Sequence, residues 1–327
     1  MALWHDMLGW MSPKEAAVAA HSLRAMAEAG MPTTRSLQVL VRDSRGPGRA
    51  IWRRVLHRVA DEGVPLGAAA RAERGMPRLL GQMLDAGEAT GRLAHMAGVA
   101  AEYYDRRRRL SVGAWRALMP IVALLAVGGA AVGGLGMVLG GGFSLRGLLA
   151  TLSMVLGPLL VLAVVWLVLQ AVPVLRRARD RILLRVPMLG PALLELNEAQ
   201  FALVLGAAND AGLPSVEAVA MAYAAMGNAF LRRGAPEAVR TVAARGTMAE
   251  ALEAGGMPRE LVAAVAAAEA SGTLPGTLSA LGQRAGESAE HGLKVFQELV
   301  VRVAWLCVIV WLAVHVAGRS GAITHAD

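Results

Sequence analysis

The chain has 327 residues, of which 55% are hydrophobic, and its mean hydropathy of +0.47 is high for a soluble protein of this size. Its single cysteine, Cys307, excludes an intramolecular disulfide and a cysteine metal cluster. The formal net charge of +8 can indicate nucleic acid or an anionic membrane surface as a partner. Because much of the arginine lies beside three apolar segments, we favour the membrane and expect no nucleic acid.

The composition predicts an all-α fold. Aromatic residues make up only 4% of the chain, so Ala, Leu, Val and Met must fill the core. Ala, Leu, Met, Arg and Glu all favour helix, and few stretches show the alternation of β-branched and aromatic residues that is typical of strands.

The first domain is expected over residues 1–110 as a bundle of six helices. The first helix follows Ser12, which can act as an N-cap in a capping box with Glu15. That helix is expected to stop at Gly30, and Pro32 precedes the next one. The later helices are expected over residues 50–62, 65–74, 79–86 and 93–109, with a Gly/Pro-rich loop over residues 43–49.

A corner of small residues, GEATG, occupies residues 87–91 and is followed by helix and then by four arginines, Arg106, Arg107, Arg108 and Arg109. Glu88 in this corner has a counterpart late in the chain, Glu269. We expect each carboxylate to cap the N-terminus of the helix that follows it. The alternative is a docking surface or a weak cation site, and the two interpretations are compatible.

Two long apolar segments then predict a membrane hairpin over residues 115–142 and 147–175. No charge lies between Arg116 and Arg146, and a helix needs only about 20 residues to cross a bilayer. A third segment, residues 299–317, is just long enough to span. Since the first eleven residues lack a basic start, we expect the first span to direct membrane insertion.

Charge predicts the orientation of these segments. The four arginines before the hairpin, together with Arg176 and Arg177 after it, place both large domains in the cytoplasm by the positive-inside rule. The short tail, residues 318–327, is then expected on the other side of the membrane.

Residues 189–297 repeat the first domain. Gly212 and Pro214 match Gly30 and Pro32, and further on Gly246 matches Gly63. The corner GMP at 256–258 matches 75–77, and Glu269, Gly272 and Leu274 match Glu88, Gly91 and Leu93. The offsets are 182, 183, 181 and 181 residues, so we interpret the second domain as a duplicated copy.

Signatures of catalysis are missing from the sequence. It contains no P-loop, no His-Glu-x-x-His, no Cys-x-x-Cys and no Gly-x-Ser-x-Gly. We therefore predict no catalytic residue, no metal and no cofactor, and expect a protein that is not an enzyme. A transporter or a membrane-tethered adaptor remains the alternative.

The duplicated domain, and above all Gly87-Glu88-x-x-Gly91-x-Leu93, resembles the type II secretion system F domain family (the GspF/PilC-like platform proteins). The order of domain, two spans, domain and third span is also similar to that family. The second copy has Ala268 in place of the first glycine, and the third span lacks the family's Glu-Pro start.

The resemblance implies an inner-membrane platform protein of type II secretion or type IV pilus assembly. It implies two homologous cytoplasmic six-helix bundles and three transmembrane helices in a bacterial inner membrane, with a periplasmic tail. The implied partners are a hexameric assembly ATPase, pilin or pseudopilin subunits, other inner-membrane components, membrane lipids and further copies of the chain.

Overall fold

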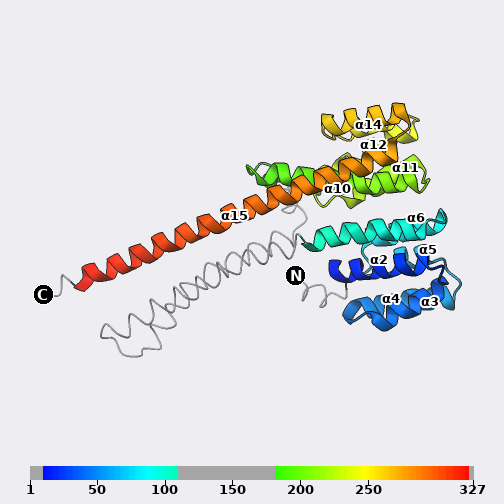
Figure 1. Cartoon of the computed structure of the whole chain (residues 1–327), viewed down its shortest axis with the longest axis horizontal. Helices are drawn as coiled ribbons and strands as arrows, with labels where there is room; N and C mark the ends of the chain where they lie inside the picture. Colours follow the sequence, from blue (N-terminus) through cyan, green and yellow to red (C-terminus); the bar gives the residue numbers. More distant parts are fainter. Residues whose placement is uncertain (1–9, 110–180, 324–327) are drawn as a thin grey trace. The chain divides into compact units, whose positions relative to one another are not determined.

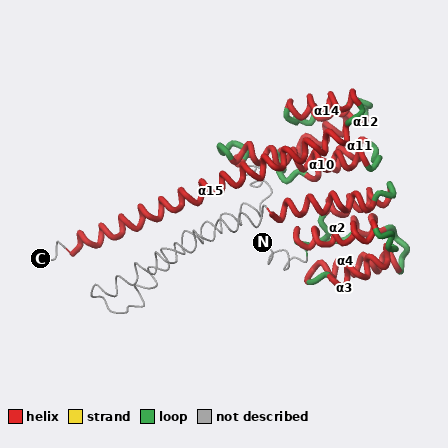
Figure 2. The backbone as a smooth tube through the Cα atoms, in the orientation of Figure 1, coloured by secondary structure: helices red, strands yellow, loops and turns green. Residues whose placement is uncertain are grey.

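Helices build every regular element in the residues that the computed structural model describes, which are 10–109 and 181–323 (Figures 1 and 2). The predicted all-α class is confirmed for these residues. The first helix, α2 (Pro13–Glu28), begins with the predicted capping box. Ser12 Oγ accepts from the Glu15 N–H at 3.2 Å, and the Glu15 carboxylate accepts from the Ser12 N–H at 2.8 Å.

The remaining helices of the first module follow α2 in a chain of neighbours. They are α3 (Thr33–Asp43), α4 (Gly46–Ala60), α5 (Leu66–Ala72), α6 (Arg78–Ala89) and a helix over residues 93–109. Each helix packs on the next, since α2 contacts α3, α3 contacts α4, α4 contacts α5 and α5 contacts α6.

Two expected boundaries are wrong. The loop predicted over residues 43–49 is shorter, because α4 already begins at Gly46 and takes Pro47 into its first turn, where the fixed φ of proline suits a helix. The corner predicted over residues 87–91 is also shorter. Gly87 and Glu88 belong to the last turn of α6, and only Thr90 and Gly91 make the turn.

The second module has its helices in the same order. They are α10 (Leu189–Asp210), α11 (Ser215–Ala225), the 3-10 helix η2 (Leu231–Gly234), α12 (Ala235–Ala243), α13 (Met248–Ala254), α14 (Arg259–Ser271) and α15 (Leu274–Ile323). α11 and α13 each begin 182 residues after their counterparts α3 and α5. This order and spacing support a duplicated module.

The two modules belong to one compact unit, which consists of Met1–Leu110 and Pro191–Glu290. Buried side chains of both modules form one hydrophobic cluster, which includes Leu80 and Met83 of α6 as well as Val204 of α10 and Met221 of α11. The two predicted bundles therefore share a core.

The second unit contains Ser111–Gly190 and His291–Asp327. The predicted spans at 115–142 and 147–175 lie outside the described residues, as do the last four residues of the predicted tail. The range 299–317 lies within α15, whose backbone is a single helix from Leu274 onward. Over the described stretches of the chain, no helix meets both the length and the apolarity that crossing a membrane requires.

Candidate functional site

Glu88 caps a helix that lies earlier in the chain. Its carboxylate accepts hydrogen bonds from the backbone N–H of Leu66, at 3.0 Å, and of Gly67, at 2.7 Å, which are the first two residues of α5. The residue before α5, Pro65, makes no side-chain cap. Both carboxylate oxygens are thus engaged at a helix N-terminus, where N–H groups lack intrahelical partners and the dipole favours negative charge.

Glu269 has the same arrangement in the second module. Its carboxylate accepts from the N–H of Met248 at 2.9 Å and of Ala249 at 3.3 Å, at the start of α13. Here a second cap is present, because Thr247 and Glu250 form a capping box on the same helix. The α13 cap therefore has a redundancy that the α5 cap lacks.

The helix predicted to receive the cap was wrong in both modules. We expected Glu88 to cap the helix that follows it. Because Glu88 lies in the last turn of α6, its side chain projects sideways from that helix and reaches the adjoining start of α5. The two helices approach closely there, since a Cβ atom at Gly67 would overlap the backbone of Asp85.

The other motif residues shape the turn between α6 and the next helix. A Cβ atom at Gly87 would lie 2.9 Å from Met96 Cβ and 3.0 Å from Leu93 Cα, so this glycine permits a close helix crossing. Gly91 has the left-handed φ of +69°, and so does its counterpart Gly272. Leu93 and Leu274 pack partly buried against the core.

The repeat corners have matching geometry. Gly30 and Gly212 have φ of +66° and +79°, and Pro32 and Pro214 are the N-cap residues of α3 and α11. In each corner the N–H after the glycine bonds a carbonyl five residues back, at 2.9 Å and 3.0 Å, which closes the end of the preceding helix.

The match of Gly246 with Gly63 is shifted by one residue. The residue that takes the left-handed conformation of Gly63 is Arg245, with φ of +66° against +68°. The offset then becomes 182, like that of the first corner. Gly246 instead lies close to Thr241, because a Cβ atom at 246 would be 2.9 Å from the Thr241 carbonyl oxygen.

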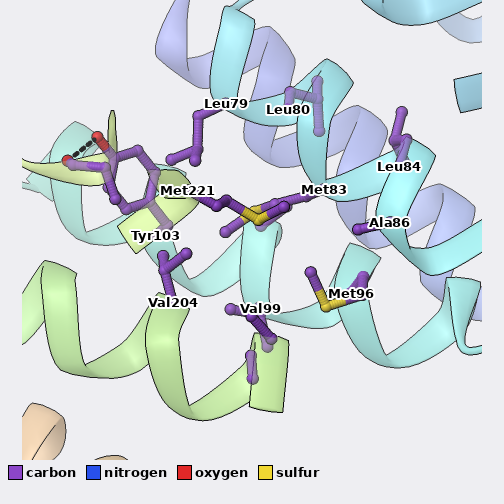
Figure 3. Close-up of a cluster of buried hydrophobic side chains, with 14 of the residues drawn as sticks. Leu79, Leu80, Met83, Leu84, Ala86, Met96, Val99, Tyr103, Val204 and Met221 are labelled. Atoms are coloured by element: carbon purple, nitrogen blue, oxygen red, sulfur yellow. Dashed lines mark hydrogen bonds between the residues drawn. The ribbon is translucent and has the colours of Figure 1, made fainter. Parts of the chain in front are cut away.

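The contact between the modules is the most extensive feature around the motif. Figure 3 shows side chains of α6, of the 93–109 helix, of α10 and of α11 gathered in one buried cluster. Tyr103, 3% exposed, lies in it and donates a hydrogen bond of 2.9 Å to the carbonyl oxygen of Ala225. We expected Tyr103 and Tyr104 at a membrane interface, but both are buried in this unit.

A family model described as type II secretion system (T2SS), protein F, matches residues 19–140 and 201–317, which is more than half of the chain. The chain belongs to the protein F family. Each matched segment begins inside one module and runs past its end into an apolar stretch of the sequence. No curated protein matches the chain.

The basic run of this protein F family member enters the shared core. Arg106 is 7% exposed, and its guanidinium lies 3.5 Å from the Glu102 carboxylate and 3.8 Å from that of Glu290 on α15. It also donates to the Gly282 carbonyl oxygen at 3.4 Å. A Cβ atom at Gly286 would overlap this guanidinium, so α15 approaches Arg106 through a glycine.

The neighbouring arginines continue the contact. Arg109 lies 3.3 Å from the Glu290 carboxylate, and Arg107 donates to the Tyr103 hydroxyl at 3.2 Å. Arg176 and Arg177 lie outside the described residues. The predicted orientation in the membrane is not tested by these contacts, which show that part of the run holds the two modules together.

A surface groove of about 580 Å³ lies between α2 and the 93–109 helix. Its polar lining includes His21, Arg24 and Glu28 from α2, and Glu102, Asp105 and Arg109 from the other helix. Within it, His21 Nε2 is 2.6 Å from an Asp105 carboxylate oxygen. We did not predict this groove, although each trio has the i, i+3, i+7 spacing of one helix face.

Groups of metal-ligating side chains are absent from residues 10–109 and 181–323, where no three His, Cys, Asp or Glu come together in a suitable way. The groove offers charges of both signs instead. Such a surface can bind a polar protein segment, and nothing in it brings a nucleophile and a base to one reacting atom.

Proposed function

We propose that this protein F family member is the inner-membrane platform protein of a type II secretion or type IV pilus apparatus. It couples a hexameric cytoplasmic assembly ATPase to the polymerisation of pilin or pseudopilin subunits. The observation that carries this proposal is the match of the family model to two segments, each of which joins a helical module to an apolar stretch.

The shared core supports a mechanical role. The modules bury common side chains and are further joined by Tyr103, Arg106 and Arg109. A packed core transmits displacement instead of absorbing it, because interiors have few voids and low compressibility. A push by the ATPase on one module is therefore passed to the other.

The ends of the unit supply the path to the membrane. Its first part ends at Leu110, just before the apolar segment at 115–142, and its second part ends at Glu290 on α15. Arg109 and Glu290 pair at these two exits. α15 continues as one helix of 50 residues, about 75 Å at 1.5 Å per residue, through the third apolar range.

Membrane insertion of the range 299–317 is supported by the side chains of α15. Large apolar residues on it are exposed, among them Leu306 at 62% and Ile309 at 55%. Such a row fits lipid better than water. Arg302, near the start of the range, can extend its guanidinium to the interface. In this proposal both modules are cytoplasmic and the tail is periplasmic.

The protein acts in this account as a scaffold and not as an enzyme. Its partners are the ATPase, the filament subunits, other inner-membrane components, lipids and further copies of itself. The mixed-charge groove beside Arg109 is the surface that best suits a polar segment of the ATPase, since both oxygens of Glu88 already bond α5.

Cysteine labelling tests the topology. After Cys307→Ser, single cysteines are introduced at Arg74, Arg232 and His325, one in each module and one in the tail. A membrane-impermeant thiol reagent added to intact cells should label only the His325→Cys variant. Labelling of a module from outside would contradict the proposed orientation.

Co-purification tests the coupling. The full-length protein in detergent should retain the assembly ATPase encoded in the same cells, and the double change Arg24→Glu with Glu28→Arg should weaken that retention. The control exchanges charges away from the groove, at Glu237 and Arg240. Equal retention by both variants would remove the groove from the ATPase contact.

A further inference from the structure

The two modules differ sharply in charge although their folds correspond. Residues 1–110 hold 17 arginines and lysines against 11 acidic residues. Residues 191–290 also hold 11 acidic residues, but only six arginines and no lysine. One module is therefore basic and the other acidic, which a duplicated fold does not by itself require.

Much of the excess lies on the outer face of α4. Arg45 stands at its start, and Arg49 and Arg53 follow at i+4 and i+8, all three exposed and opposite the buried face that holds Ile51 and Val55. Among the described residues no carboxylate pairs with these three. Their neighbours Arg54 and Arg58 differ, since both pair with the buried Glu73.

These arginines are not needed for the fold of the module. At the offset of 182 residues the second module has Gly227, Leu231 and Ala235 in the places of Arg45, Arg49 and Arg53. Like charges spaced by four residues repel each other and destabilise a helix. The arginine face is thus a feature of the first module alone, held at a cost to its own stability.

The second module has a complementary carboxylate cluster. Glu195 and Glu198 lie on α10, and Glu260 lies in the first turn of α14. Burial and the repulsion of Glu195 and Glu260 raise the pKa of Glu198 to about 7. The corresponding places in the first module are Pro13, Ala16 and Leu79, which carry no charge.

Within one chain the two charged surfaces do not satisfy each other. α4 packs on α3 and α5, whereas α14 packs on α13. In the described parts of the molecule no ion pair joins the arginine face to the carboxylate cluster. Each surface is left open to a partner of opposite charge, and the second copy of the same chain carries that charge.

We propose that the arginine face of α4, Arg45, Arg49 and Arg53, docks on the carboxylate cluster of α10 and α14, Glu195, Glu198 and Glu260, of a second copy of this chain. The contact is head-to-tail, because it joins different surfaces of the two copies. Such contacts build closed rings or open chains, unlike the two-fold contact of a symmetric dimer. The inference stands independently of the filament that the protein serves.

Charge reversal on the full-length protein in detergent tests the contact. Arg49→Glu with Arg53→Glu should weaken self-association at least about tenfold in sedimentation velocity, and so should Glu195→Lys with Glu260→Lys. Mixing these two variants should restore association, since each then offers the charge that the other needs. Association of the native protein should also fall as salt is raised.

A matched control separates this contact from a general effect of net charge. Arg232→Glu with Arg284→Glu changes the total charge by the same amount at exposed positions of the second module, and should leave self-association intact. Circular dichroism melting of each variant shows that it is folded. If the mixture of reversed variants fails to associate, or if the arginine variant associates like the native protein, the proposal is wrong. Loss of binding to anionic vesicles by the arginine variant, with self-association unchanged, would assign the face to lipid and also overturn it.

Discussion

The hydroxyl of Tyr103 donates a hydrogen bond of 2.9 Å to the carbonyl oxygen of Ala225, and so ties the last helix of the first module to the second. The bond is buried, and Tyr103 packs edge-on against Tyr104 at a centroid distance of 5.0 Å. Tyr223, one turn before the end of α11, is also buried, but its hydroxyl has no partner among the described residues. The two tyrosines form a natural comparison.

Tyr103→Phe should lower the free energy of unfolding by about 1–2 kcal/mol, because it leaves a buried carbonyl oxygen unpaired. Tyr223→Phe should leave stability unchanged or raise it by up to about 1 kcal/mol, since it removes an unpaired buried hydroxyl and keeps the ring against Phe201. Thermal unfolding of the full-length protein measures both. Equal losses in the two variants would show that the Tyr103 bond does not distinguish them.

Glu88→Ala should destabilise the protein by about 1–2 kcal/mol, because α5 has no other side-chain cap. Glu269→Ala should cost less than about 1 kcal/mol, since the capping box at Thr247 still serves α13. The measurement is the shift in melting temperature of each variant. A larger shift for Glu269→Ala would contradict the assignment of these caps.

Arg245→Gly should stabilise the protein by about 1 kcal/mol, because Arg245 takes a left-handed φ that glycine adopts without strain. The neighbouring change Gly246→Ala should destabilise it, since the new methyl group would press on the Thr241 carbonyl. Denaturant unfolding compares the pair. A stabilising Gly246→Ala would mean that the left-handed residue is misplaced by one position.

Stability should respond to pH through Glu198. Burial, Glu195 and Glu260 raise its pKa to about 7, above the ordinary value of 4.5. The folded state therefore binds the proton more tightly, and stability falls as pH rises between these two values. Glu198→Gln should stabilise the protein by about 1 kcal/mol at pH 8, once solvent screening is allowed for, and should have little effect at pH 4.

Thermal unfolding at both pH values checks this prediction, with Glu287→Gln on the exposed side of α15 as the control. The control should show no such difference between pH 4 and pH 8. A Glu198→Gln effect that is the same at both pH values would place the carboxyl in an ordinary, solvated environment.

Local signals in the sequence predict much of this fold. The capping box at Ser12 and the glycine corner at Gly30 act within a few residues, so their spacing is enough to find them. The target of Glu88 and the burial of Arg106 are set by helices that become neighbours only in the folded chain. Such contacts leave no periodic signal, and Arg106 in particular was hidden among three other arginines.

The duplication was the most informative sequence feature for the candidate site, and it also marks where the copies differ. Arg245 in the place of Gly63 shows that a register chosen by residue identity can be wrong by one position. The conformation of the backbone corrects it, because a left-handed residue must end the helix at that point whatever its side chain.

The most direct test of the central claim is filament assembly in cells that lack this chain. Deletion of its gene should abolish surface pili or type II secretion, and the native gene supplied in trans should restore them. Pili and secretion that persist at native levels in the deletion strain would contradict the account of this protein as their assembly platform.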